Sequence, residues 1–183
     1  MRIAGDLTGK RVLVTGAGPV GCLVIAAALA SGATDVIATD ISERCRSLAR
    51  KMGASAALDP RDEQNCASWT LKGGFFDACF EASGAASAAT SLVDYTLPGG
   101  IIVQLGMGAA EVNYPLGSLL VKEIQLRESF RFVNGFSTAV RWLETGKINP
   151  LPLLTAELSM EQALSALELA ADKERAAKVQ LIF

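Results

Sequence analysis

The stretch RVLVTGAGPVG, residues 11–21, decides the fold expected for this chain. A short apolar run passes directly into the pattern Gly-x-Gly-x-x-Gly, and a segment rich in Ala, Leu and Val follows. This order predicts a buried strand, a tight turn and a helix, which is the setting in which the pattern binds a dinucleotide. Gly16 permits the turn, Gly18 lets the backbone approach a pyrophosphate, and Gly21 lets the helix lie close to the strand. Pro19 suits the first helical turn, where free N–H groups and the helix dipole attract phosphates.

A carboxylate follows the glycine pattern at the distance typical of dinucleotide-binding sites. Asp40 ends the second predicted strand, 19 residues after Gly21, where a carboxylate can accept both hydroxyls of an adenosine ribose. The alternative is a bend that binds nothing, with Asp40 stabilising the start of the next helix beside Ser42. A carboxylate here repels the additional phosphate of NADP, so we expect NAD to be preferred, unless Arg44 or Arg46 turns toward that phosphate.

Apolar runs alternate with amphipathic stretches along the rest of the chain. This alternation predicts an α/β fold, a doubly wound parallel sheet of the Rossmann type. The predicted strands cover residues 11–15, 35–39, 76–81, 100–105 and 124–129, with a weaker strand at 56–58 and a last one at 178–182. Helical spacing is clearest over residues 45–52, 136–143 and 163–170, and turn residues occupy 97–100 and 149–152. We therefore expect a dinucleotide-binding domain over residues 1–148, followed by a linker, helix and strand over residues 149–183.

Composition excludes several classes of function. The 17 Lys and Arg against 19 Asp and Glu include no basic run, so no nucleic-acid partner is expected. The chain has no histidine, which excludes Ser-His-Asp and Cys-His catalysis. Its four cysteines form no Cys-x-x-Cys pair, so we expect reduced thiols and assign neither a metal ligand nor a catalytic residue. No apolar run is long enough to span a bilayer, so we expect a cytoplasmic protein without a membrane partner.

The loops after the later strands should complete the pocket, because the carboxyl ends of parallel strands share one edge of a sheet. Leu105, Met107 and Phe130 would provide an apolar bed for a nicotinamide ring, unless they are ordinary core side chains. Arg131 would hold a substrate carboxylate or hydroxyl in bidentate fashion, unless it is a solvated surface arginine. The loop after residues 76–81 adds Ser83 and Gly84 as predicted cofactor contacts.

Together these residues resemble the zinc-containing medium-chain dehydrogenases, in particular the sorbitol and L-idonate 5-dehydrogenase branch. The resemblance implies NAD contacts at Val20 and Asp40 and substrate contacts at Arg131 and Phe132. It also implies nicotinamide contacts at Leu105, Gly106, Met107, Phe130 and Arg131. Phe132 stands where sorbitol dehydrogenases commonly have tyrosine, which favours the idonate-like branch, and Cys45 replaces a basic residue that often flanks the adenine. The similar stretches cover residues 9–21, 76–84, 99–106, 129–132 and 178–181.

The resemblance implies the NAD-binding domain of an oxidoreductase that oxidises a secondary alcohol of a polyol or sugar acid, with L-idonate converted to 5-ketogluconate. Hydride passes to NAD with the help of zinc. Family members begin with a GroES-like barrel domain that carries the zinc ligands, and nothing in this chain corresponds to it. We therefore expect zinc only in that absent domain, toward which residues 149–183 return, and NAD binding without turnover. The resemblance also implies a homodimer or homotetramer, formed through an edge strand near Ile124.

Two other functions fit the glycine loop and Asp40. A non-catalytic NAD-sensing regulatory module would bind the same cofactor, and a methyltransferase would bind S-adenosylmethionine there. The methyltransferase hypothesis leaves Arg131 without a role. A short-chain dehydrogenase is disfavoured because its Tyr-x-x-x-Lys pair is missing: Tyr95 and Tyr114 are followed four residues later by glycine and serine.

Overall fold

The main body of the protein is a parallel sheet. The computed structural model describes residues 1–108, 111–131 and 135–183. Within these ranges, six strands pair in the order β3-β2-β1-β4-β5-β6. The chain moves outward from β1 to β3, crosses back to β4 and moves outward again to β6, which is the doubly wound arrangement predicted from the sequence. The strands are β1 (Arg11–Thr15), β2 (Asp35–Thr39), β3 (Ala56–Leu58), β4 (Phe76–Glu81), β5 (Thr96–Gln104) and β6 (Gln125–Glu128).

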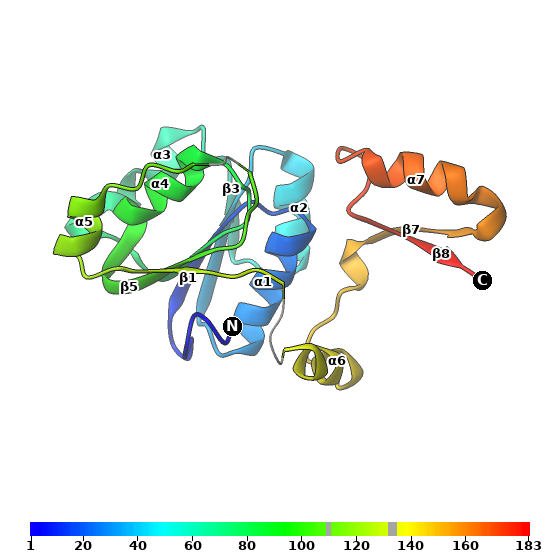
Figure 1. Cartoon of the computed structure of the whole chain (residues 1–183), viewed down its shortest axis with the longest axis horizontal. Coiled ribbons are helices and arrows are strands. Elements are labelled where there is room, and N and C mark those ends of the chain that lie inside the picture. The colour runs from blue at the N-terminus through cyan, green and yellow to red at the C-terminus, as the bar shows by residue number, and fades with distance from the viewer. Residues whose placement is uncertain (109–110, 132–134) are drawn as a thin grey trace.

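Helices cover both faces of this sheet, with α1 and α2 on one side and α3, α4 and α5 on the other (Figure 1). No helix in the described part of the chain has the length and apolar character needed to cross a membrane. The helices are α1 (Pro19–Ala30), α2 (Glu43–Lys51), α3 (Glu63–Cys66), α4 (Ala86–Tyr95), α5 (Leu116–Val121), α6 (Phe136–Glu144) and α7 (Ala163–Ala171). Short 3-10 turns are η1 (Ala67–Gly73), η2 (Leu151–Leu153) and η3 (Met160–Gln162).

Alternate strand residues face two separate cores. Val12, Val14 and Phe80 pack with the residues of α1 and α2, whereas Leu13 and Cys79 pack with those of α4. Both faces of the central strands are therefore buried, which is why these strands read as continuous apolar runs. Burial of each large apolar side chain contributes about 1.5–3 kcal/mol to this packing.

The carboxyl ends of the strands lie level with one another. Thr15 is paired with Thr39 on one side and with Glu81 on the other, Glu81 is paired with Gln104, and Gln104 is paired with Glu128. Because the last residues of five strands form one row, the loops that follow them leave the sheet side by side. This row is what places the predicted site residues along a single edge.

The fourth long strand differs from its predicted extent. β5 begins at Thr96, which pairs with Phe76, and pairing resumes with Ile101 opposite Ala78. The predicted turn at residues 97–100 is therefore an irregularity inside β5, where Pro98 and Gly99 are exposed to solvent. Pro98 and Gly99 indicate a change of direction in the chain. The sequence does not indicate that β5 pairs with β4 both before and after this irregularity.

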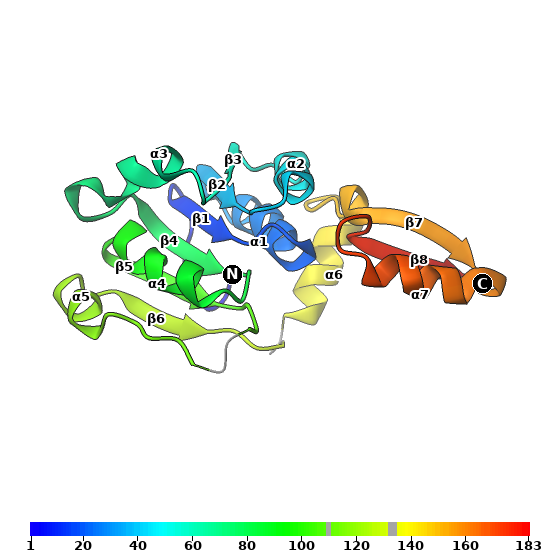
Figure 2. The same ribbon diagram turned by 90° about the horizontal axis from the view of Figure 1, so that it is seen from above.

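The last part of the chain forms a second sheet, in which β7 (Leu154–Ser159) pairs in parallel with β8 (Lys178–Ile182). Figures 1 and 2 place this sheet and α7 at one end of the molecule, beyond α6 and apart from the six-stranded sheet. Leu153 is 5% exposed and belongs to the core beneath α1 and α2, so it anchors this region to the main body. β7 has no counterpart among the predicted strands, because its sequence LTAELS is rich in helix-forming Leu, Ala and Glu.

All four cysteines are free thiols. Burial raises the pKa of Cys22 to about 12 and that of Cys79 also to about 12. Both side chains therefore stay protonated at neutral pH, where a thiol is a poor nucleophile and a poor metal ligand.

Candidate dinucleotide-binding site

The bend after β1 requires glycine at two positions for steric reasons. Gly16 has a φ of 85°, and a Cβ atom there would lie 2.5 Å from the backbone nitrogen of Ser83. A Cβ atom on Gly21 would overlap the carbonyl oxygen of Gly16. The first and last glycines of the pattern therefore allow the close approach of strand, loop and helix that was predicted from the sequence.

Gly18 is different, because the chain itself does not require glycine there. Its φ of −66° and ψ of −174° suit any residue, and a Cβ atom would meet nothing within 4 Å. Gly18 is the N-cap of α1, has no side-chain capping bond, and is followed by a first turn without an acidic residue. The positive end of a 12-residue helix thus faces open space, and an anion such as a pyrophosphate fits this opening.

Asp40 lies beside this bend. Its Oδ2 atom accepts a hydrogen bond of 2.7 Å from the backbone N–H of Ala17, and its Oδ1 atom accepts one of 2.8 Å from that of Ser42. Ser42 is the N-cap of α2, so Asp40 supports the start of that helix while also facing the glycine loop. Each carboxylate oxygen keeps acceptor capacity for a further donor, such as a ribose hydroxyl.

The two arginines that follow Asp40 make contacts elsewhere. Arg46 has a side chain that is 13% exposed, and its Nη1 atom donates to the Asp40 carbonyl at 2.7 Å and to Asp59 at 3.0 Å. Arg61 and Arg46 hold the pKa of the Asp59 carboxyl well below its usual range, so this ion pair persists at neutral pH. Arg44 donates to the carbonyl of Lys173 at 3.4 Å. Neither guanidinium group is therefore directed at the ribose side of Asp40.

The loops after β4 and β5 are in direct contact, and Glu81 joins them. Its side chain is completely buried and accepts hydrogen bonds from the Ser83 N–H at 2.7 Å and the Gly84 N–H at 3.0 Å. It also accepts a hydrogen bond of 2.7 Å from the Nε2 atom of Gln104. Glu81 is not among the site residues predicted from the sequence. The available signal was a single charged residue at the end of an otherwise apolar strand.

The predicted nicotinamide contacts differ in their exposure. Leu105 is half-buried against the core beneath α1, whereas Met107 is 80% exposed. Phe130 is also largely exposed, and the Arg131 guanidinium lies 5.0 Å from the centre of its ring. Arg131 has a φ of 54°, an uncommon conformation for a residue with a side chain. Phe132 lies outside the described residues.

The structure thus brings the predicted residues together in two groups along one edge. Gly16, Gly18, Pro19, Val20, Gly21 and Asp40 gather at the ends of β1 and β2. Ser83, Gly84, Leu105 and Gly106 gather at the ends of β4 and β5, with Met107 at the exposed rim. Phe130 and Arg131 follow β6, one strand further along.

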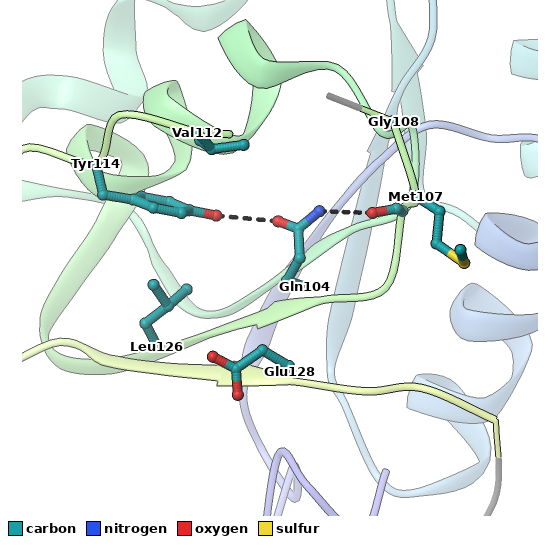
Figure 3. A pocket seen from close by; sticks show the side chains of 8 residues that line it. Gln104, Met107, Gly108, Val112, Tyr114, Leu126 and Glu128 are labelled. Atoms are coloured by element: carbon teal, nitrogen blue, oxygen red, sulfur yellow. Dashed lines mark hydrogen bonds between the residues drawn. The ribbon is translucent and has the colours of Figure 1, made fainter. Parts of the chain in front are cut away.

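A cavity of about 340 Å³ lies next to the second group, between β5, β6 and the segment that precedes α5. Tyr114, Leu126 and Glu128 line it together with Gln104 and residues 106–108 and 112. Figure 3 shows the Tyr114 hydroxyl directed at the Gln104 side chain, which on its other side reaches the backbone of the loop after β5.

The chain is similar to known dehydrogenases. Residues 19–145 match the family described as zinc-binding dehydrogenase. The chain belongs to this family. It is 45% identical over 180 residues to L-idonate 5-dehydrogenase (NAD(P)(+)) of Escherichia coli, covering 98% of this chain and 52% of that protein. It is 37% identical over 174 residues to sorbitol dehydrogenase 1 of Saccharomyces cerevisiae, covering 90% of this chain and 49% of that protein.

A solved structure has the same fold as this chain. The crystal structure of L-idonate 5-dehydrogenase from Escherichia coli matches with a TM-score of 0.93 at 45% identity, over 98% of this chain and 52% of that one. The resemblance to the zinc-containing dehydrogenases of the idonate and sorbitol branch is therefore confirmed. The chain spans about half the length of the curated relatives it matches.

The residues that the structure describes do not form a zinc site. The sequence has no histidine. In residues 1–108, 111–131 and 135–183, no group of three or more Cys, Asp or Glu side chains is arranged to hold a metal ion. The open position at Gly18 and the carboxylate of Asp40 could instead hold a dinucleotide.

Proposed function

We propose that this chain is the NAD-binding domain of an oxidoreductase that oxidises a secondary alcohol of a polyol or sugar acid, with L-idonate as the substrate. The observation that carries the proposal is the opening at Gly18, which faces the positive end of α1 and has Asp40 beside it. Membership of the zinc-binding dehydrogenase family and the 45% identity to an L-idonate 5-dehydrogenase support the class of substrate.

Each group of residues has a role along an extended cofactor. The N-terminal turn of α1 binds the pyrophosphate, and Asp40 binds the ribose of the adenosine half. The loops after β4 and β5 line the nicotinamide half, and Arg131 and Phe132 are the proposed substrate-binding residues. Bound NAD supplies the acceptor for a hydride. Because no residue here is assigned to the chemistry or to zinc, the 183 residues bind NAD without turnover.

The division of the chain is part of this proposal. Residues 1–148 form the dinucleotide-binding domain, and residues 149–183 return toward a barrel domain that holds zinc in the whole enzyme. The position of β7, β8 and α7 apart from the main sheet supports this division, as does the exposure of Leu164 and Leu167 on α7. Apolar side chains exposed together on one helix are typical of a surface that another domain covers.

We expect NAD to bind at least about tenfold more tightly than NADP, because the Asp40 carboxylate would face the additional phosphate. Arg46 is held by Asp59 and the Asp40 carbonyl, so it offers no compensating charge. Isothermal titration of the purified chain with both cofactors measures the ratio. Equal or tighter binding of NADP would contradict the cofactor preference, and tight binding of S-adenosylmethionine would favour a methyltransferase instead.

We further propose a homodimer or homotetramer, formed through β6. In the described residues β6 is the last strand of the sheet, and its outer edge leaves backbone groups free to pair with a second copy. Sedimentation velocity at micromolar concentration should give at least twice the mass of the 19.1 kDa chain. A species of 19.1 kDa at that concentration would contradict self-association of this domain.

A further inference from the structure

Glu81 is an unusual residue for its position. It is the last residue of β4, between Thr15 of β1 and Gln104 of β5, and its side chain is 0% exposed. None of the ion pairs formed by the described residues includes Glu81. Burial of a carboxylate is costly unless hydrogen bonds satisfy its oxygens, so this side chain needs an explanation beyond packing.

The hydrogen bonds to the Glu81 side chain come from the loop after β4 and from the last residue of β5. Ser83 donates through both its backbone N–H and its hydroxyl, and the Gly84 N–H lies 3.0 Å from Oε1 and 3.1 Å from Oε2. Gln104 donates to Oε2 from the neighbouring strand. All of these partners are donors, so they require a group that only accepts. Glutamine has the same shape, but its NH₂ group would face the N–H of Gly84 or the amide of Gln104.

Gln104 extends the network to the second loop and to the cavity in Figure 3. Its Nε2 atom donates to the Gly106 carbonyl at 2.9 Å as well as to Glu81, and its Oε1 atom accepts from the Tyr114 hydroxyl at 3.0 Å. Two acceptors, Glu81 and the Gly106 carbonyl, face the NH₂ group of the amide, and one donor, the Tyr114 hydroxyl, faces its oxygen. These partners fix the amide in one orientation. Through this amide, one carboxylate holds the loops at 83–84 and 104–106 in a single arrangement.

We propose that Glu81 is a positioning residue that fixes these two loops to receive the nicotinamide half of the cofactor. The inference rests on the proposed function. The glycine bend and Asp40 stand at the ends of β1 and β2, whereas the Glu81 network stands at the ends of β4 and β5. An extended dinucleotide crosses from one pair of strands to the other. Glu81 therefore acts on one half of the cofactor and leaves the adenosine diphosphate half unchanged.

The test compares Glu81→Gln with Asp77→Asn, a matched control on the same strand. Asp77 also accepts a backbone hydrogen bond, from Arg11 at 2.8 Å, but at the opposite end of the sheet. Titration calorimetry with NAD and with ADP should show about tenfold weaker NAD binding for Glu81→Gln and less than about twofold change for ADP. The fluorescence of bound NADH, which reports the surroundings of the nicotinamide, should change in this variant alone.

Gln104→Met is the second variant, in case Glu81→Gln does not fold. It removes the donor from Gln104 at a half-buried position and keeps the buried carboxylate, so we expect about threefold weaker NAD binding with unchanged ADP binding. Equal losses for NAD and ADP, or unchanged NAD binding in both variants, would overturn the positioning role while leaving the cofactor site intact. Failure of the unsubstituted chain to bind either ligand would overturn the proposed function and the positioning role with it.

Discussion

Replacing Gly21 with alanine should lower the free energy of unfolding by about 3 kcal/mol and abolish NAD binding. The added methyl group would overlap the carbonyl oxygen of Gly16. Gly16 cannot easily give way, because its N–H donates to the Thr39 carbonyl at 2.8 Å and its own Cβ position lies against the Ser83 backbone. For a chain of this length, the loss corresponds to a decrease in Tm of about 6–12 °C. Urea denaturation followed by circular dichroism measures it.

Gly18→Ala is the matched control, since it adds the same methyl group three residues earlier. A Cβ atom there meets nothing and the backbone conformation suits alanine. Alanine restricts the unfolded chain but is a poorer N-cap than glycine, so the free energy of unfolding should change by less than about 1 kcal/mol. NAD binding should nevertheless be lost, because the methyl group occupies the approach to α1 that we assign to the pyrophosphate. A stable Gly18→Ala variant that binds NAD normally would show that the opening at Gly18 has another purpose.

The second large effect is expected for Asp40→Ala, which should weaken NAD binding about 100-fold. The substitution removes the acceptor for both ribose hydroxyls and leaves the Ala17 N–H without its 2.7 Å partner. ADP binding should weaken by a similar factor, because Asp40 acts on the adenosine half of the cofactor. In Glu81→Gln, by contrast, ADP binding should hardly change. Titration calorimetry with NAD, NADP and ADP measures all three constants.

Asp35→Asn provides the control for this prediction, because Asp35 begins the same strand and lies at its opposite end. Its binding constants should match those of the unsubstituted chain. If Asp40→Ala binds NAD as tightly as the Asp35→Asn control does, the carboxylate serves only to support the start of α2. The alternative interpretation of Asp40 would then be correct.

The sequence predicts the fold and the adenosine side of the site because their determinants are local. The run at residues 11–21 contains the strand, the turn and the start of the helix, so its glycines can be interpreted without knowledge of the rest of the chain. Asp40 follows one crossover later, and the register of β1 and β2 brings it to the bend. Parallel strands joined by a right-handed crossover leave little choice in this placement.

Features that depend on distant partners could not be predicted in this way. Gln104, the partner of Glu81, lies 23 residues away on the next strand. Arg46 forms an ion pair with Asp59, 13 residues away, and the sequence alone does not indicate that the two side chains meet. β7 is a strand because β8 pairs with it, despite a composition that favours a helix. In each case a tertiary contact determines the side-chain partner or the secondary structure, and the local sequence does not indicate that contact.

The most direct test of a dinucleotide site at this edge of the sheet is a ¹H–¹⁵N correlation spectrum of the labelled chain recorded during titration with NAD. We expect the amide signals of Ala17, Gly21, Ser42, Gly84 and Gly106 to shift together with a single dissociation constant, because one extended cofactor contacts the ends of β1, β2, β4 and β5. A spectrum that does not change would contradict the claim that one extended cofactor binds along the carboxyl ends of these strands. Shifts confined to the hollow between α1, α2 and residues 147–152 would contradict it as well.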